Sequence, residues 1–508
     1  MNPKEAPMSP APALYARRWQ ALIVLAMSLL IVSVDNTILN VALPTIRTEL
    51  DASSSQLQWI VDSYLLVFAV LLLIAGTLGD RFGRKKALSL GLFIFGLGSG
   101  LSALAGSADM LILTRALMGI GGAFIMPSTL SILTAVFPAH ERGKAIGIWA
   151  AVSGLGIVIG PVTGGWLVEH GDWSLVFLVN LPFVAAALIA GRWLVPDSRD
   201  PAAPRLDVGG FLLSSLGLGA LVAALIEAPG RGWADPMILA GFGLAAAALA
   251  AFVAWEMRVR EPMLDVRLFR NRRFSAASGA IALAFFALFG TIFFLTQYLQ
   301  MVMGYSALEA GIRIMPVAAG LILGGPLSAK LTERIGTKRV VSVGLLLVAA
   351  GLVLLSGAQV DSGYGLIAGV LTLIGLGMGL TMAPATESVM GSLPLAKAGV
   401  GSAVNDATRT LGGALGVAVL GSLLSSGYRA GMDGASAVAQ DSLTGALALA
   451  GKTGDAGLAG AARQAFVDGM HGAVLVGAGI ALLGALLAAV ALPARASAPA
   501  LVAEPATA

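Results

Sequence analysis

The stretch Gly76 to Leu88 reads G-T-L-G-D-R-F-G-R-K-K-A-L and places one acid and four basic residues between two long apolar runs. A related stretch, Ala329 to Val341, reads A-K-L-T-E-R-I-G-T-K-R-V-V and follows 253 residues later. Asp80 in the first stretch corresponds to Glu333 in the second. A charged turn at the same place in two apolar halves indicates a duplicated membrane domain.

The composition points to a membrane protein. Of the 508 residues, 57% are apolar and only 12% are charged, and the mean hydropathy is +0.87. A globule in water cannot hide so much apolar surface, so lipid is the expected solvent. The net charge of +4 would suit a nucleic acid, but the basic residues cluster in short loops, which argues against that partner. The chain has no Cys, and its three His show no ligand spacing, so we expect no metal and no cofactor.

Fourteen apolar segments are long enough to cross a bilayer, which takes about 20 residues. Six of them precede and six follow a shorter hairpin of two. The first is expected to be retained, because no small-residue cleavage site follows it. The expected spans are 19–43, 57–78, 87–106, 109–134, 144–168, 174–194, 208–228, 236–256, 275–300, 310–331, 338–357, 363–388, 401–425 and 472–492.

The basic residues set the orientation. Of the 32 Lys and Arg, 24 lie in the two termini and the loops that follow even-numbered spans, six lie in the other loops, and Arg115 and Arg409 lie within spans. Loops rich in Lys and Arg stay on the cytoplasmic side. Both termini are therefore expected to be cytoplasmic.

The expected layout has three parts. Residues 1–195 form a six-helix bundle, 196–274 contain a linker and the two inserted helices with a basic cytoplasmic loop, and 275–508 form a second six-helix bundle. Within the basic loop, 257–274 reads as an amphipathic stretch on the inner leaflet, with a nucleic-acid or partner site as the alternative. The segment 427–471, rich in Gly, Ala and Ser, is expected to be a long external loop with little structure.

Three further motifs identify a family. The first span ends with V-D-N-T-I-L-N-V-A-L-P at Val34–Pro44, and the fourth carries R-x-x-x-G-x-G at 115–121. The motif of the fifth span consists of Gly154, Gly160, Pro161, Gly164 and Gly165. Together with the opening stretch, these motifs resemble the fourteen-span drug:proton antiporter branch of the major facilitator superfamily, over almost the whole chain.

The resemblance implies an all-α integral membrane protein of the major facilitator fold, with two six-helix bundles and an inserted hairpin. It implies a multidrug efflux antiporter in a bacterial-type cytoplasmic membrane, driven by the proton gradient and active against lipophilic compounds, including mono- and dications. The fifth-span motif is linked by this resemblance to antiporters rather than symporters. The oligomeric state stays open, with a monomer as the working assumption.

Charged residues inside spans are candidates for coupling proton to substrate, because each costs a few kcal/mol to insert. Counted along their helices, Asp35 lies about 14 Å, Asp62 about 8 Å and Arg115 about 9 Å from the outer end. At such depths they could share one aqueous cavity, where an acid could exchange its proton for a cationic substrate. The alternative is a static Asp–Arg pair that holds helices together.

Further residues are assigned to the substrate cavity. Asp62 lies in W-I-V-D-S-Y, so the sequence resembles exporters of quaternary ammonium compounds and methyl viologen, and Trp59 and Tyr64 could stack on aromatic cations. Asp406 is a fourth coupling candidate, although it can pair with Arg409 on its own helix. The remaining cavity candidates are Asn36, Asn405, Arg409 and Glu387, the last near the inner end of its span and therefore more typical of the interface.

The opening stretch itself is interpreted as a gating motif made of Gly76, Asp80, Arg81, Gly83, Arg84 and Lys85. Asp80 is placed to meet the positive N-terminal end of a helix from the other half. The basic residues would pair with acids or lipid phosphates. The second copy has Thr337 in place of Arg84, so its lock should be weaker.

Two alternatives stay open. The chain could export one natural product or antibiotic rather than many drugs. An intramembrane enzyme is a remote possibility, since no catalytic constellation is present and the Gly154-x-Gly156 pair lies inside a span rather than after a strand. There is no phosphate-binding Walker sequence, which excludes ATP-driven transport within this chain.

Overall fold

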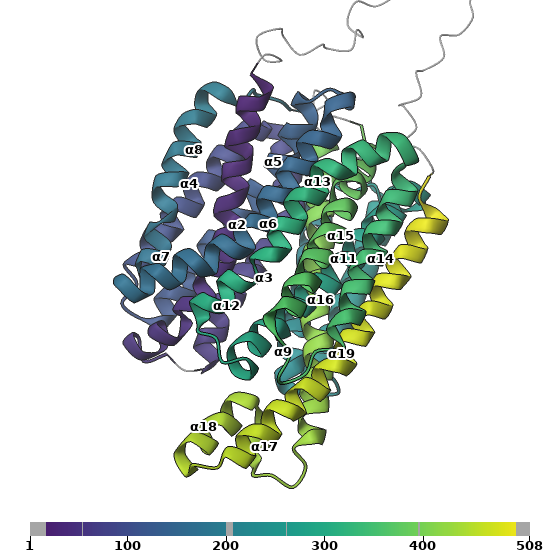
Figure 1. The fold of residues 1–508 in the computed structure, drawn as a ribbon. Coiled ribbons are helices and arrows are strands. Elements are labelled where there is room, and N and C mark those ends of the chain that lie inside the picture. Colours follow the sequence, from purple (N-terminus) through teal and green to yellow (C-terminus); the bar gives the residue numbers. More distant parts are fainter. Residues whose placement is uncertain (1–16, 53, 200–206, 261, 395–396, 494–508) are drawn as a thin grey trace, which may run out of the picture.

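A computed structural model describes residues 17–52, 54–199, 207–260, 262–394 and 397–493. Within these ranges the chain is helical and contains no β-strand. Fourteen helices are long and apolar enough to cross a membrane, which confirms the expected all-α fold with fourteen spans. The start of α2 and the end of α19 lie at the same end of the bundle (Figure 1), which we call the terminus face.

The first six spans are formed by seven helices. They are α2 (Arg18–Glu49), α3 (Ser54–Phe82), α4 (Arg84–Ala103), α5 (Ala108–Val136), α6 (Ala139–His170), and α7 (Leu175–Leu178) with α8 (Asn180–Leu194), which make the sixth span together. Gly83 separates α3 from α4 with φ of 114°. This left-handed backbone is cheap only for glycine, so the charged turn of the opening motif depends on it.

The last six spans are built in the same way. They are α11 (Arg272–Gln297) with a π-helical turn η2 (Tyr298–Val302), α12 (Ala307–Arg313) with α13 (Met315–Ile335), α14 (Thr337–Leu355), α15 (Tyr364–Met390), α16 (Ala398–Gly431) and α19 (Ala456–Ala491). Ser306 and Glu309 form a capping box at the start of α12, which satisfies two backbone N–H groups of that helix end. Gly336, with φ of 85°, divides α13 from α14 as Gly83 divides α3 from α4.

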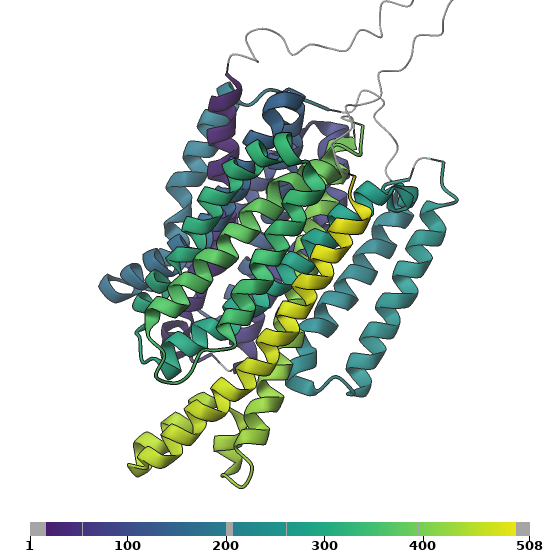
Figure 2. The same ribbon diagram turned by 45° about the vertical axis from the view of Figure 1, so that its right-hand side comes forward.

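The inserted hairpin consists of α9 (Val208–Arg231) and α10 (Pro236–Glu256). Helix α9 packs against α3 of the first six spans and α16 of the last six, whereas α10 packs mainly on α9. Figure 2 shows the hairpin standing beside the rest of the bundle. Most of α10 is therefore turned toward lipid, which suits its apolar composition. A short 3-10 turn, η1 (Val266–Arg270), leads from the hairpin into α11.

The expectation of an unstructured external loop at 427–471 is wrong. Helix α16 continues to Gly431, α17 (Ala437–Asp441) and α18 (Leu443–Thr453) follow, and α19 begins at Ala456. Alanine is the strongest helix former, so an Ala-rich stretch folds into helix even where no lipid covers it. The result is a helical projection at the end opposite the terminus face (Figure 1), which we call the α17–α18 lobe.

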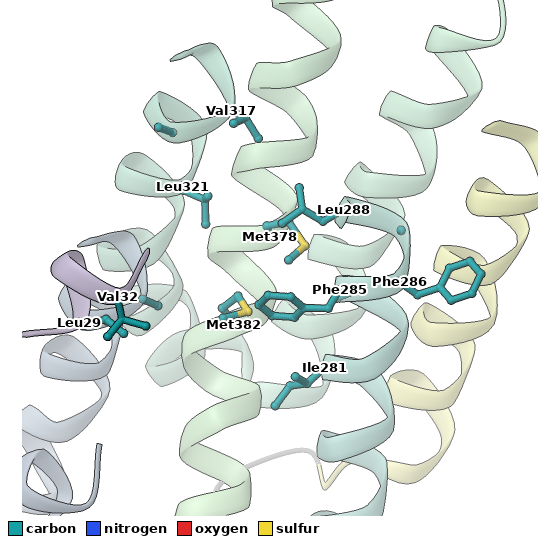
Figure 3. Packing of buried hydrophobic residues seen from close by; sticks show 14 of the residues in the cluster. Leu29, Val32, Ile281, Phe285, Phe286, Leu288, Val317, Leu321, Met378 and Met382 are labelled. Carbon is teal, nitrogen blue, oxygen red and sulfur yellow. The ribbon is translucent and has the colours of Figure 1, made fainter. Parts of the chain in front are cut away.

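The two sets of six spans meet along a seam formed by α6 with α13 and α15, and by α16 with α3 and α5. Glycine allows the closest approach. A Cβ on Gly399 of α16 would stand 2.5 Å from the carbonyl oxygen of Gly76 of α3, so any larger residue would push the helices apart. Apolar side chains fill the interior, where Phe285 of α11 points toward Met382 of α15 (Figure 3).

Candidate functional site

The first buried polar cluster joins Asp35 of α2 to Arg115 of α5. Arg115 Nη1 lies 2.6 Å from Asp35 Oδ2, and both side chains are at most 1% exposed. Arg115 Nε also donates to the backbone oxygen of Ile60 at 3.2 Å. The charges of a buried pair need such additional hydrogen bonds, because each loses its hydration.

Asn180 and Ser99 complete this cluster, and neither was identified from the sequence. Asn180 Nδ2 donates to Asp35 Oδ1 at 3.2 Å and to Ser99 Oγ at 3.1 Å. Ser99 in turn donates to the carbonyl oxygen of Phe177. Asn180 is a lone amide in an otherwise apolar stretch, a signal that could have marked it as the partner of a buried charge.

Tyr64 also belongs to the first cluster, but through its ring. The guanidinium carbon of Arg115 lies 4.6 Å from the centre of the Tyr64 ring. The residue before Gly119 is Met118, and its sulfur lies 3.7 Å from Arg115 Nη1. Asn36 donates to the carbonyl oxygen of Val32 in its own helix.

Asp62 does not lie with Asp35 and Arg115, and the expectation of one shared cavity is wrong for this structure. Asp62 and Tyr64 are two residues apart, about 200° around a helix. Tyr64 turns toward Arg115, so Asp62 turns to the other side of α3. There it shares one face with Trp59, three residues earlier.

That other side of α3 carries a cavity of about 320 Å³ between α3 and the hairpin, which we call the hairpin cavity. Its polar residues are Asp62, Glu227 and Arg231, and the last two form an ion pair of 2.8 Å. Its walls are otherwise apolar. Trp59 is therefore assigned to the hairpin cavity and Tyr64 to the Asp35–Arg115 cluster, although the sequence grouped the two.

The second buried polar cluster is centred on Asp406 and Arg409 of α16. Arg409 Nη1 lies 3.6 Å from Asp406 Oδ1, with side-chain exposures of 8% and 1%. The i, i+3 spacing thus brings the pair together as predicted. Asn405 donates to Asp406 Oδ1 at 3.3 Å and accepts from Thr386 of α15.

Arg409 also reaches across the seam into the first six spans. Its guanidinium carbon lies 5.1 Å from the ring centre of Trp149 and 4.7 Å from that of Phe285. Its Nη2 lies 3.4 Å from Ser153 Oγ of α6. Trp149, Ser153 and Phe285 were missed from the sequence, because their partner is more than 100 residues away. The one local signal was a Trp in the middle of a glycine-rich span.

The Asp406–Arg409 pair is only partly satisfied. Asp406 Oδ2 and Arg409 Nη1 are buried and make no hydrogen bond with the described residues. A buried charged group with unused hydrogen-bonding capacity is costly, so it gains from any partner that completes it. The cluster can therefore take a proton or a polar ligand at the seam without first losing existing bonds.

Glu387 lies outside both clusters, so its assignment to the substrate cavity is not supported. It stands at the terminus face, where Arg142 of α6 and Arg273 of α11 are close enough to attract it. A Cβ on Gly143 of α6 would stand 3.0 Å from Glu387 Oε2. Glu387 thus connects α15 to the other side of the seam by charge.

At the same face, Asp80 of α3 contacts the start of α16. Asp80 Oδ1 accepts from Gly399 N at 2.9 Å, and Oδ2 accepts from Val400 N at 3.1 Å. Arg84 Nε donates to Asp80 Oδ1 at 2.8 Å. The structure thus shows the predicted contact between Asp80 and a helix N-terminus of the other half.

The other basic residues of the motif lie around this contact. Lys85 donates to the carbonyl oxygen of Arg192 at 2.7 Å, and Arg81 lies over the ring of Phe82. Glu333, the counterpart of Asp80, is exposed. The weaker lock expected of the second copy agrees with this difference.

The fifth-span motif separates two faces of α6. Gly160 and Gly164 lie against Ile38 of α2. A Cβ added at either glycine would stand 2.9 Å from a backbone atom of Ile38. Gly154 lies against Leu321 of α13 and Gly165 against Leu308 of α12. One face of α6 thus packs closely on α2 of its own bundle, and the opposite face packs on α12 and α13 of the second bundle. Pro161 lies beside Gly311 of α12.

In the part of the chain that the structure describes, no three acidic or His side chains are grouped so as to hold a metal ion. The arrangement instead consists of ionisable groups in an apolar interior. Such groups can exchange protons and bind charged or aromatic ligands.

Comparisons with known proteins identify related sequences over most of the chain. The model of the Major Facilitator Superfamily matches residues 25–417. The chain is 38% identical to the tetracenomycin C resistance and export protein of Streptomyces glaucescens, over 84% of this chain and 79% of that protein. It is 35% identical to the multidrug efflux pump LfrA of Mycolicibacterium smegmatis, over 94% and 96%, and 37% identical to the puromycin resistance protein pur8 of Streptomyces alboniger, over 80% and 81%.

Solved structures share the fold. The human organic anion transporter MFSD10 superposes with a TM-score of 0.63 at 16% identity, covering 93% of this chain and 99% of that one. The proton:xylose symporter XylE superposes with a TM-score of 0.58 at 15% identity, covering 93% and 95%. At these identities the likeness is one of fold.

Proposed function

Because the chain belongs to the major facilitator superfamily, and is thus a multi-pass transporter of small molecules in the plasma membrane rather than an enzyme, we propose that it exports lipophilic drugs in exchange for protons. The substrates we propose are predominantly cationic. The relatives include a multidrug efflux pump and antibiotic resistance proteins, which supports export of drugs as the general activity.

One observation carries the proton-coupled part of this proposal. Asp406 and Arg409 lie at the seam between the two bundles with a carboxylate oxygen and a guanidinium nitrogen unused. A group at the seam is reached from different sides as the bundles rock, and this is where transporters of this type bind substrate. A group sealed inside one bundle would not change its access in this way.

In the proposed cycle, the carboxylate of Asp406 binds either the proton or the cation. A proton on Asp406 removes its charge and frees the Arg409 guanidinium to rest on Trp149 and Phe285. A cationic aromatic substrate would take the place of that guanidinium on the same rings and would need Asp406 ionised. Exclusive occupancy of one carboxylate couples the two fluxes.

Asp35 is the second proposed acid. Asp35 is sealed by Arg115 and Asn180 in the conformation described. It would take a proton only when α2 and α5 move relative to each other within their own bundle and weaken that pairing. Arg115 then controls when Asp35 can be protonated.

We further propose that the terminus face is cytoplasmic, from the excess of Lys and Arg in its loops. Asp80 with Gly399, and Glu387 with Arg142, would then hold the cytoplasmic side of the seam closed. Opening toward the cytoplasm would require both contacts to break.

A dedicated exporter of one natural product is the second candidate. It is favoured by relatives whose names carry a single compound, tetracenomycin C in one case and puromycin in another. The multidrug reading is favoured by LfrA, with its coverage of nearly both whole chains. The two candidates predict the same coupling residues and differ only in substrate range.

The test is efflux from proteoliposomes that contain the purified chain. A pH gradient is imposed, and loss of entrapped compound is followed for monocations, dications, neutral drugs and anions. Export of many lipophilic cations that stops when an ionophore collapses the gradient supports the multidrug proposal. Export of one compound class supports the dedicated exporter, and export that ignores the gradient contradicts proton coupling.

A further inference from the structure

Two carboxyl groups are buried together where the hairpin meets the terminus face. Asp207 precedes the first residue of α9, and Glu256 is the last residue of α10. They are 8% and 3% exposed. Neither belongs to the seam or to the two clusters described above.

One oxygen of each carboxyl group has a clear partner. Asp207 Oδ1 accepts from Gly210 N and from Trp255 Nε1, both at 2.8 Å. Glu256 Oε2 accepts from Leu264 N, in the linker to α11, at 3.2 Å. The acid pair thus connects both helices of the hairpin to the linker.

The other two oxygens face each other. Asp207 Oδ2 and Glu256 Oε1 are buried and make no hydrogen bond within the described residues. A Cβ on Gly210 would stand 2.6 Å from the first and 2.5 Å from the second. The carboxyl groups are within hydrogen-bonding reach of each other. A larger residue at position 210 would have to displace both of these oxygens.

Two ionised carboxylates cannot form such a bond, because both are acceptors only. The other charged group that faces Glu256 is Asp265 of the linker, which is also an acid. Among the described residues, no Lys or Arg forms an ion pair with Asp207 or Glu256. Two neighbouring buried anions would be strongly unfavourable, whereas one proton removes a charge and supplies the missing donor.

We propose that Asp207 and Glu256 bind one proton between them, in a carboxylic acid–carboxylate hydrogen bond at a site separate from the transport pathway. The ligand of this site is the proton of the compartment at the terminus face. Its bond fastens the base of the hairpin to the linker that enters α11.

The hairpin makes this site relevant to both bundles. Ser215 of α9 donates to the carbonyl oxygen of Val70 in α3, and Trp233 in the turn donates to Ser422 of α16. Loss of the shared proton leaves two anions at the hairpin base and loosens its hold on Leu264. Because the two facing carboxylates repel each other when both are ionised, the stabilising effect of the shared proton is present at low pH and is lost as pH rises.

The experiment compares the purified full-length protein with Glu256→Gln. The amide of Gln donates permanently to Asp207 Oδ2, in place of the proton. We expect the wild-type melting temperature to fall by a few degrees more than that of Glu256→Gln as pH is raised from mildly acidic to alkaline. Glu227→Gln, at the other end of the hairpin, is the matched control and should follow the wild type.

A spectroscopic measurement keeps the test independent of stability. The infrared carbonyl band of a protonated carboxylic acid should be present in the wild type at neutral pH and reduced by one group in Glu256→Gln. Efflux driven by a fixed gradient should be the same for both. An unchanged band, identical pH dependence of melting, or stabilisation by added Na⁺ or Mg²⁺ in place of protons would each overturn the proposal.

Discussion

The Asp35–Arg115 and Asp406–Arg409 ion pairs, both buried among the spans, differ in how completely they are bonded. Asp35 and Arg115 lie within one bundle, 2.6 Å apart, with Asn180 and a backbone carbonyl as further partners. Asp406 and Arg409 lie on one helix at the seam, 3.6 Å apart, with one atom of each unused. We therefore expect the first pair to stay intact more readily than the second.

The largest expected effect is a difference in folding stability between variants that lose the acid of one pair or of the other. Asp35→Asn removes the anion beside a guanidinium that is 1% exposed, and breaking such a buried pair costs about 3–5 kcal/mol. Asp406→Asn should cost clearly less, because Asp406 makes few bonds. Denaturant titration of both purified variants, monitored by tryptophan fluorescence, measures the difference. Equal losses would show that the two pairs are energetically alike.

The next effect concerns transport. Asp406→Asn should lower gradient-driven efflux at least tenfold, about 1.4 kcal/mol, because the amide cannot take up and release a proton. Asp406→Glu should restore part of the rate, since it keeps the titratable group. Rates are measured in proteoliposomes with a matched imposed pH gradient. Full activity of a folded Asp406→Asn protein would remove this residue from the coupling mechanism.

A smaller effect is expected at the contact between the Arg409 side chain and the ring of Trp149. Trp149→Leu removes a ring on which Arg409 rests and on which we propose the cation stacks, and such contacts contribute about 1 kcal/mol. Efflux of aromatic cations should fall roughly fivefold, with less effect on non-aromatic ones. Trp166→Leu, at a residue 57% exposed, is the control. The same loss in both variants would point to a general packing effect.

The smallest effect is expected at the terminus face, where Asp80 joins the two bundles across the seam. Asp80→Asn keeps one acceptor for Gly399 N or Val400 N but loses the charge that Arg84 and the helix end attract. We expect a cost of about 1 kcal/mol and a few-fold lower efflux. Glu333→Gln should have no measurable effect, because Glu333 is exposed. Equal effects of the two changes would mean that both copies of the motif act alike.

The fold could be predicted almost completely, because fourteen apolar segments and a repeated motif leave few alternatives. The segment 427–471 was the exception. Its Gly and Ser suggested a loop, but its alanines form α17, α18 and the extended ends of α16 and α19. Composition alone does not tell whether the loop preference of Gly and Ser or the helix preference of Ala prevails.

The site could be predicted only in part. The pairing of Asp406 with Arg409 was readable from spacing, because the two residues are three positions apart on one helix. The position of Asp62 was not, because spacing shows that it opposes Tyr64 but not which of the two faces inward. Ser153 is 256 positions away from Arg409 in the sequence, and no local pattern carries the information that the two side chains meet.

Helix α16 has a consequence of its own. It begins at the Asp80 contact, carries Asp406 and Arg409 in its first half, binds the hairpin through Ser422, and ends at the α17–α18 lobe. With 34 residues it is about 50 Å long. The α17–α18 lobe is therefore attached to the same long helix as Asp406, the proposed coupling acid. A nanobody that grips the lobe would restrain that helix from a distance, and would give imaging methods a feature outside the detergent belt.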